Sequence, residues 1–403
     1  YYPAGSNYPR FVRRRARSGA PEECLLDGDS LARGHACFFL EGIQVSPDHA
    51  FLLYAVDTTG DRRFRLAVKD LATNRLLPDR IENADSACAW MLDRRSFVYV
   101  RLDPVTLRPW QVRRHAIGTD PARDPILFEE PDPAIRCLVG ATHSRRHVLI
   151  TCFSDDREDV RCMDAAAPDR PPVLLLPRRA GLECEADHDG AGWIVRSNRT
   201  APDFSVESLD APGTRPDAWL RLVPGRPGVL IERALAFRDH LAMIVRDGGR
   251  QRLRILDRRT GALHEPALPD PDGHVWLDAN TDPDAACVRF GYTSLISPPA
   301  YYDYDLRRHR LILRGRERIP GYDRRAYATR RVWVPASDGA RMPVILAGRR
   351  EVFRRGSAPL LLFAYGAYGT NIPLYFSQNR LPLLRRGFLY GMAHVRGGSE
   401  LGR

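Results

Sequence analysis

One unit recurs between the N-terminus and about residue 320, and it limits the folds open to the chain. Six stretches of five to seven residues, rich in β-branched, aliphatic and aromatic side chains, begin 45 to 51 residues apart. Turns rich in Asp, Ser, Arg or Gly precede them, and helical periodicity is almost absent. These features predict β-strands. The stretches are Phe51–Asp57, Phe97–Asp103, Val148–Phe153, Trp193–Ser197, Leu241–Asp247 and Cys287–Tyr292.

A pair of strands follows each of these stretches, and one further pair lies near the N-terminus. A period of about 40–50 residues with four strands per unit is typical of a β-propeller. Seven pairs with six preceding strands predict a seven-bladed propeller whose first blade is incomplete, with Tyr1 and Tyr2 as the tail of the missing strand. Two β-sandwiches in tandem are the alternative, but they would not require so constant a spacing. The predicted pairs are Phe11–Leu26, Leu66–Leu77, Gln111–Phe128, Val160–Leu176, Phe204–Leu222, Leu253–Leu263 and Tyr302–Leu313.

The pattern changes after Asp323. Two alternating runs flank the pair Asp338-Gly339, which predicts a hairpin. The segment from Pro359 to the end then predicts a buried strand at Leu360–Phe363, a Gly- and Tyr-rich turn, a helix and a second buried strand at Phe388–Val395. Apolar runs joined by a helical crossover are typical of a parallel α/β sheet. The chain is therefore expected to be mainly β, with a propeller at residues 1–323 and the first part of an α/β domain at 324–403.

The composition argues against several classes of partner. The net charge is +11, but the arginines are scattered in pairs without interleaved aromatic residues, so we expect no nucleic-acid partner. No apolar run reaches the roughly 20 residues of a membrane span, so we expect no membrane partner.

The eight cysteines lack metal-ligand spacing and are expected to be free thiols in a cytoplasmic, reducing compartment. We expect no metal and no other cofactor. Four histidines beside turns or strand ends are expected at the surface rather than as catalytic bases: His115, His143, His147 and His309.

Several strings resemble the prolyl oligopeptidase family of serine peptidases, and most of all its oligopeptidase B branch. The resemblance runs the full length of the chain, and the last 45 residues, Pro359–Arg403, are its most specific part. The matching strings are Gly42–Asp57, Arg108–Asp120, Ile319–Asp323, Asp338-Gly339, Tyr365–Gly369, Arg385–Phe388 and His394–Gly402.

This resemblance implies a seven-bladed propeller that caps an α/β-hydrolase domain and admits only short or unstructured peptides. It implies an enzyme that hydrolyses short peptides after basic residues through an acyl-enzyme. The family's Ser-Asp-His triad would lie beyond Arg403, and its N-terminal helical segment would precede Tyr1. The sequence is therefore expected to be an interior fragment without activity of its own. The alternative is a propeller that serves as a binding module and not as an enzyme.

The resemblance also assigns candidate site residues. Tyr365 matches the tyrosine whose hydroxyl stabilises the oxyanion of the tetrahedral intermediate, and the alternative role is packing over a tight turn. Tyr368 is expected to pack. Pro373 and Tyr375 are candidate substrate-binding residues, because they lie in the loop Asn371–Phe376, where oligopeptidase B commonly carries acidic residues that bind a basic substrate residue beside the cleavage site. The loop has no carboxylate here, which argues against a preference for paired basic residues.

Ser399 is not expected to be the nucleophile. A nucleophile elbow needs Gly-x-Ser-x-Gly, and Leu401 stands where the second glycine belongs. Ser399 instead replaces a glycine of the family's Arg-Gly-Gly-Gly-Glu turn. Arg396 and Glu400 flank this turn and are expected to form a structural ion pair.

Overall fold

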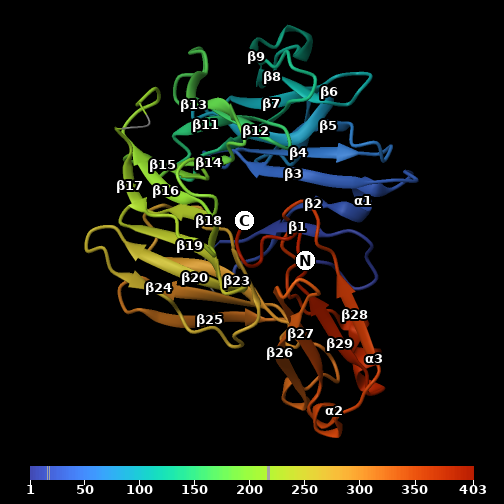
Figure 1. The fold of residues 1–403 in the computed structure, drawn as a ribbon. Helices are drawn as coiled ribbons and strands as arrows, with labels where there is room; N and C mark the ends of the chain where they lie inside the picture. The colour runs from blue at the N-terminus through green and yellow to red at the C-terminus, as the bar shows by residue number, and fades with distance from the viewer. Residues whose placement is uncertain (16, 18, 216–217) are drawn as a thin grey trace. The chain divides into compact units, whose positions relative to one another are not determined.

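The structure is a computed structural model that describes residues 1–15, 17, 19–215 and 218–403. Most of its regular elements are β-strands arranged in antiparallel sheets (Figure 1). The chain divides into two compact units. The first comprises Tyr1–Leu182 with Ala211–Gly213, and the second comprises Glu183–Asp210 with Thr214–Arg403.

The first unit contains a seven-stranded sheet and a four-stranded sheet, each in chain order. The seven-stranded sheet consists of two four-stranded parts that share the 16-residue strand β6, which pairs with β5 up to Ala84 and with β7 from Ala84 onward. Its strands are β3 (Phe39–Val45), β4 (Phe51–Asp57), β5 (Phe64–Asp70), β6 (Arg75–Trp90), β7 (Ser96–Leu102), β8 (Pro109–Ala116) and β9 (Ile126–Glu129). The second sheet consists of β10 (Arg136–Ala141), β11 (His147–Phe153), β12 (Arg157–Asp164) and β13 (Val173–Ala180).

The N-terminal hairpin of the first unit consists of β1 (Arg10–Arg13) and β2 (Glu23–Asp27), followed by helix α1 (Gly28–Ala32). The backbone of Tyr1 runs beside β1: the Arg10 amide donates to the Tyr1 carbonyl at 2.8 Å, and the Tyr1 amino group donates to the Arg10 carbonyl at 3.2 Å. Tyr1 thus lies beside β1 without forming part of a strand, and its assignment to the tail of a preceding strand stays a prediction.

The second unit contains three four-stranded antiparallel sheets, also in chain order. The first is β14 (Cys184–His188), β15 (Trp193–Ser197), β16 (Ser205–Leu209) and β17 (Leu220–Val223). The second is β18 (Val229–Ala236), β19 (His240–Asp247), β20 (Arg250–Asp257) and β21 (Leu263–His264). The third is β22 (His274–Leu277), β23 (Cys287–Thr293), β24 (Ala300–Asp305) and β25 (Arg310–Arg316).

The predicted repeat corresponds closely to these sheets. The second strand of each four-stranded set, from β4 to β23, starts within one residue of its predicted start. Most strands in this position are largely buried on both faces, because adjacent sheets pack face to face through shared apolar clusters within each unit. In β11, by contrast, buried side chains alternate with partly buried ones. The first strand of each set was not predicted, since these strands carry polar residues, as in Cys184–His188, or a bulge, as in Phe39–Val45.

His115 contradicts its predicted surface location. It lies on β8, and its side chain is completely buried between the carboxylates of Asp79 and Asp124. Its position close to a strand end suggested exposure, but a loop with its own short helix, η1 (Pro121–Arg123), follows β8 and carries Asp124 onto the ring.

The C-terminal part of the second unit forms a mixed sheet in the order β26-β27-β29-β28. The first three of these are antiparallel neighbours, whereas β28 and β29 are parallel. The elements are β26 (Tyr327–Pro335), β27 (Arg341–Arg349), α2 (Arg350–Arg355), β28 (Leu360–Ala364), η4 (Gln378–Arg380), α3 (Leu381–Arg385) and β29 (Leu389–Ala393). The domain boundary proposed at residue 323 falls between β25 and β26 and stays a prediction.

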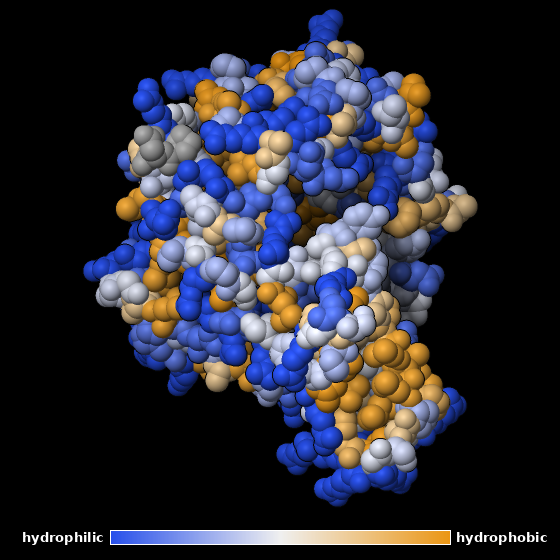
Figure 2. Space-filling view, in the orientation of Figure 1, coloured by the Kyte–Doolittle hydropathy of each residue, from blue (hydrophilic) through white to orange (hydrophobic). Residues whose placement is uncertain are grey.

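The prediction that β28 is buried is wrong, whereas β29 is largely buried as predicted. All five side chains of β28 are exposed, because among the described residues no element packs closely over either face of this edge strand. Figure 2 shows apolar side chains gathered over the surface where β28 lies in Figure 1. Within the described ranges, no helix has the length and apolar character needed to cross a membrane.

Candidate functional site

Two glycine-rich turns meet at the carboxyl ends of the parallel strands β28 and β29. The amide of Gly369 in the first turn donates to the carbonyl of Gly397 in the second at 2.8 Å. A Cβ atom on Gly366 would lie 2.5 Å from the Arg396 carbonyl oxygen, and one on Gly397 would lie 2.0 Å from the Gly366 carbonyl oxygen. All three glycines have positive φ. Glycine is therefore required for the two backbones to approach this closely.

Tyr365 follows β28 directly and opens the first turn. Its side chain is 50% exposed, and its hydroxyl makes no hydrogen bond to the described residues. The hydroxyl is thus open to an external acceptor. Tyr368 in the same turn has a φ of 56° and is 93% exposed, so the prediction that it packs is wrong. The left-handed conformation at Tyr368 projects its ring into solvent.

In the second half of the loop Asn371–Phe376, buried side chains alternate with exposed ones. Leu374 and Phe376 are buried in the apolar cluster beneath the mixed sheet. Tyr375 between them is 47% exposed, and Pro373 is partly exposed. Tyr375 is thus held at the surface by a buried neighbour on either side, and Pro373 directly precedes the first of these neighbours.

Polar contacts tie this loop to the second glycine turn. The Asn371 amide group donates to Glu232 at 2.8 Å and accepts from the Ser399 amide at 3.1 Å. Glu400 accepts from the Ile372 amide at 3.0 Å. Ser399 is buried, as a residue in a structural turn would be.

The predicted ion pair between Arg396 and Glu400 is wrong. Glu400 is buried and accepts a hydrogen bond from the backbone of the loop Asn371–Phe376. Arg396 points outward and pairs with Asp338. Adjacent positions around a tight turn point in different directions, so proximity in sequence did not identify the partners.

Arg380 adds a positive charge beside the loop, which the sequence analysis missed. Its guanidinium lies between two aromatic rings, 4.7 Å from the centroid of Tyr375 and 4.4 Å from that of Tyr390. It also donates to the Tyr375 carbonyl at 2.8 Å. No signal in the sequence identifies this arrangement, because Tyr390 reaches Arg380 only through the fold.

His394, which follows β29, is a second missed residue. It is buried, and neither ring nitrogen has a hydrogen-bond partner among the described residues. Burial, together with the nearby charges of Arg246 and Arg331, lowers the pKa of His394 to about 3. The His394 ring is therefore neutral at physiological pH and adds no positive charge to the site.

One group of potential metal ligands occurs in the described part of the first unit, formed by Glu130, Cys152 and Asp159. The guanidinium of Arg178 bonds both carboxylates, and its Nε lies 2.6 Å from Asp159. The Arg178 guanidinium thus already compensates the charge of the two carboxylates.

Comparison with known proteins identifies the family. Residues 1–314 match the family model of the prolyl oligopeptidase N-terminal β-propeller domain. The chain is 32% identical to dipeptidyl aminopeptidase BI of Pseudoxanthomonas mexicana over 416 residues, covering 99% of this chain and 57% of that protein. It is 27% identical to Protease 2 of Moraxella lacunata, covering 98% of this chain and 58% of that protein. The chain therefore belongs to the prolyl oligopeptidase family.

The solved structures agree in fold. Oligopeptidase B from Leishmania major superimposes with a TM-score of 0.91 at 24% identity, covering 99% of this chain and 58% of that one. The predicted β-propeller and the predicted resemblance to oligopeptidase B are both confirmed. The chain spans somewhat more than half the length of these relatives.

Proposed function

We propose that this chain is the propeller-bearing part of a serine peptidase that hydrolyses short peptides through an acyl-enzyme. In this proposal the propeller restricts access to folded proteins, and the mixed sheet β26–β29 is the opening part of an α/β-hydrolase domain. The nucleophile, acid and base would come from residues outside this chain. Family membership supports the reaction class, and the sheet order with one parallel pair supports the hydrolase assignment.

Tyr365 is the residue of this chain to which we assign a catalytic role. Ligands of open α/β sheets bind outside the carboxyl ends of parallel strands, and Tyr365 stands at such an end with its hydroxyl unpaired. A hydroxyl preorganised there can donate to the oxyanion of a tetrahedral intermediate, which contributes roughly 3 kcal/mol for a well-placed donor. The exposed Tyr365 hydroxyl beside the paired glycine turns is the observation that carries the proposal.

Pro373 and Tyr375 are proposed to contact the substrate residue next to the cleaved one. Arg380 lies against the Tyr375 ring, so the subsite carries a positive charge where a basic side chain would need a negative one. Cleavage after a single basic residue remains the proposed preference, and a second basic residue at this subsite is expected to be disfavoured.

The downstream coding sequence tests the peptidase proposal directly. A Gly-x-Ser-x-Gly motif followed by Asp and His supports the enzyme, whereas a stop codon directly after Arg403 favours a binding module. The second test compares chromogenic peptides that end in Arg or Lys. The 403-residue chain alone should be silent, and the chain extended by the downstream sequence should hydrolyse them. Turnover by the short chain that is blocked by serine-reactive inhibitors would contradict the proposed source of the nucleophile.

We also propose that the protein resides in the cytoplasm. All eight cysteines are free thiols, and five of them are buried. Fractionation of the source cells, followed by immunoblotting, tests this location. Recovery from an oxidising compartment would contradict it.

A further inference from the structure

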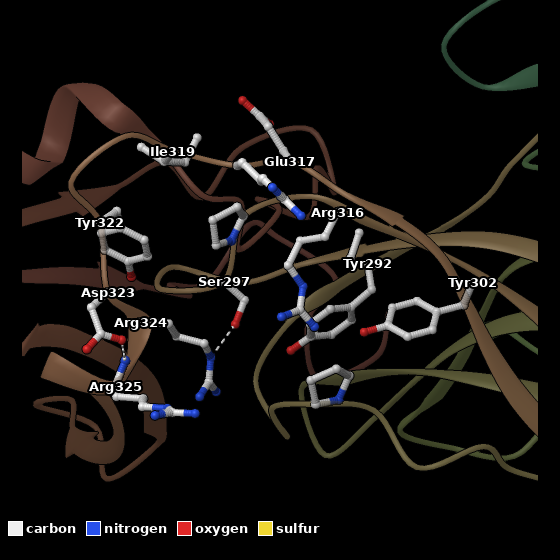
Figure 3. Close-up of a pocket in the computed structure, with 14 residues that line it drawn as sticks. Tyr292, Ser297, Tyr302, Arg316, Glu317, Ile319, Tyr322, Asp323, Arg324 and Arg325 are labelled. Carbon is white, nitrogen blue, oxygen red and sulfur yellow. Dashed lines mark hydrogen bonds between the residues drawn. The ribbon is translucent and has the colours of Figure 1, made fainter.

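A cavity of about 620 Å³ lies in the second unit, where the chain leaves β25 and passes through the short helix η3 (Arg324–Ala326) toward β26 (Figure 3). This volume falls within the range of roughly 300–1,000 Å³ that is typical of small-molecule sites. The cavity is lined by Pro269, Tyr292, Ser297, Pro298, Ala300, Tyr302, Arg316, Glu317, Arg318, Ile319, Tyr322, Asp323, Arg324 and Arg325.

The strand register explains why the cavity forms. Tyr292, Ala300 and Arg316 are direct cross-strand partners on β23, β24 and β25, so their side chains lie in one row on the same face of the sheet. The small side chain of Ala300 leaves space between its two long neighbours. Figure 3 shows Arg316 pointing from β25 into this space, toward Tyr292.

The cavity has an excess of positive charge that the protein does not neutralise. Four arginines line it, and one of them, Arg324, is bound to the buried Asp270 and donates to Ser297 at 2.8 Å. The guanidinium groups of the other three form neither an ion pair nor a hydrogen bond with the described residues. They are Arg316, Arg318 and Arg325.

The two carboxylates of the lining do not compensate these arginines. Asp323 caps η3, where it accepts from the Arg325 amide at 2.9 Å. The Glu317 side chain points away from Arg316 in Figure 3, and its carboxylate accepts from Gln378 at 3.5 Å.

The hydroxyl of Tyr302 provides an independent indication of a ligand. Tyr302 is only 8% exposed, and its hydroxyl makes no hydrogen bond to the described residues. In Figure 3 this hydroxyl points from β24 into the cavity. The protein offers this hydroxyl no partner, so its hydrogen bonds must be made with water or with a ligand in the cavity. A ligand oxygen in the cavity would supply the missing acceptor.

We propose that this cavity binds a small oligophosphate anion. Guanidinium groups match phosphate oxygens through paired N–H donors, and three unpaired ones around a single cavity favour an anion with several charges over a single carboxylate. The Tyr302 hydroxyl would donate to a further phosphate oxygen. This inference concerns a site apart from the glycine turns and does not depend on the proposed peptidase activity.

Calorimetric titration of the 403-residue chain with inorganic triphosphate tests the proposal. We expect saturable binding with one site per chain. Arg316→Gln and Arg325→Gln should each weaken binding about tenfold, since each removes charge-assisted hydrogen bonds to the anion. The matched control is Arg310→Gln, an exposed arginine at the other end of β25, which should change the affinity less than twofold.

Tyr302→Phe separates ligand binding from folding. Since the hydroxyl has no protein partner, its removal should leave the thermal midpoint of the unliganded chain unchanged or slightly raised. Binding of triphosphate should nevertheless weaken by about threefold to tenfold. Preference for ATP over triphosphate would identify a nucleotide as the occupant, and equal binding would identify a free oligophosphate; both support the site. Absence of saturable binding at millimolar triphosphate would overturn the proposal, as would an Arg310→Gln effect equal to that of Arg316→Gln.

Discussion

The Nε2 atom of His115 lies 3.0 Å from the Asp79 carboxylate, and both side chains are buried. The Nδ1 atom of the same ring lies 2.9 Å from Asp124, which also accepts from the Tyr99 hydroxyl at 3.0 Å. Ionised carboxylates only accept hydrogen bonds, so the arrangement favours an imidazolium with a proton on each nitrogen. His115 thus links β6, β8 and the loop after β8 through charge.

Stability should therefore depend on pH through His115. Burial by itself lowers the pKa of His115, but the hydrogen bonds to Asp124 and Asp79 outweigh burial and raise the pKa above the ordinary histidine value of 6.5. A raised pKa contributes stability that is fully present below the unfolded value and is lost as pH rises through the folded value. We expect the free energy of unfolding, measured by urea denaturation, to fall as pH rises above about 6.5.

Substitution of His115 tests this assignment. His115→Leu should cost about 3–5 kcal/mol, because two buried carboxylates lose their partner, and should remove the decline above neutral pH. The exposed His35 provides the control, since His35→Gln should leave the decline in place. An unchanged decline in His115→Leu would assign the pH dependence to other groups.

The ion pair between Arg331 and Asp272 should be a major source of stability in the second unit. Both side chains are buried, Nε of Arg331 lies 2.8 Å from Asp272, and the guanidinium also donates to the Gly249 carbonyl at 3.1 Å. Arg331→Ala should lower the free energy of unfolding by about 3 kcal/mol, because a buried carboxylate loses its main partner. Arg330→Ala, at the exposed neighbour on β26, should cost less than about 1 kcal/mol. Equal losses in guanidinium denaturation would contradict the assignment.

The glycine turns should tolerate substitution unequally. Gly397→Ala would place a methyl group 2.0 Å from a backbone oxygen at a φ of 91°, so we expect a loss of about 3–5 kcal/mol. Gly339 has a similar φ of 87° but no atom within 4 Å of the added methyl group, so Gly339→Ala should cost only about 1 kcal/mol. Thermal unfolding of the two variants separates two costs. Gly339→Ala measures the cost of a positive φ alone, whereas Gly397→Ala adds the clash between the methyl group and the backbone oxygen. Similar midpoints would show that the close approach of the turns contributes little.

The sequence predicted most of the repeat because most second strands are largely buried on both faces and therefore read as continuous apolar runs, as in Phe51–Asp57. First strands of a set, such as Cys184–His188, lack that run and were not predicted. The exposure of Leu360–Ala364 was not predicted either, because the sequence of an apolar strand does not show whether another element packs over its faces. The burial of His115 depends on Asp79, 36 residues away, which no local pattern reveals.

The candidate site, too, has features that the sequence predicted and features that it did not. The glycine turns and Tyr365 could be located from a family motif, since the required backbone conformation restricts the residue types. The partners of Arg396 and Glu400 and the placement of Arg380 depend on tertiary contacts and were predicted wrongly or not at all. The exposure of Tyr368 follows from its left-handed φ, which cannot be predicted from a tyrosine at this position.

Tyr365→Phe should slow the proposed peptidase without changing its fold. In the chain extended by its downstream sequence, kcat should fall by about 10²-fold while KM changes little, because the hydroxyl would bond the oxyanion and not the ground state. Tyr368→Phe, in the same turn but 93% exposed, is the matched control and should retain nearly full kcat. Parallel losses in both variants, or a change in KM alone, would rule out the oxyanion role for Tyr365.

The exposed edge strand β28 should make the 403-residue chain self-associate. Leu360, Leu361, Leu362 and Phe363 are each more than 40% exposed and consecutive, and the outer edge of β28 has no strand paired to it within the described residues. A long apolar edge with free backbone groups is a template for pairing with another chain. Light scattering of the purified chain should therefore show concentration-dependent growth in mass. Leu361→Lys should suppress this growth, because a charge on the edge disfavours pairing, whereas the same change at the isolated exposed residue Val105, in Val105→Lys, should not. Growth that is equal in both variants would place the association elsewhere on the surface.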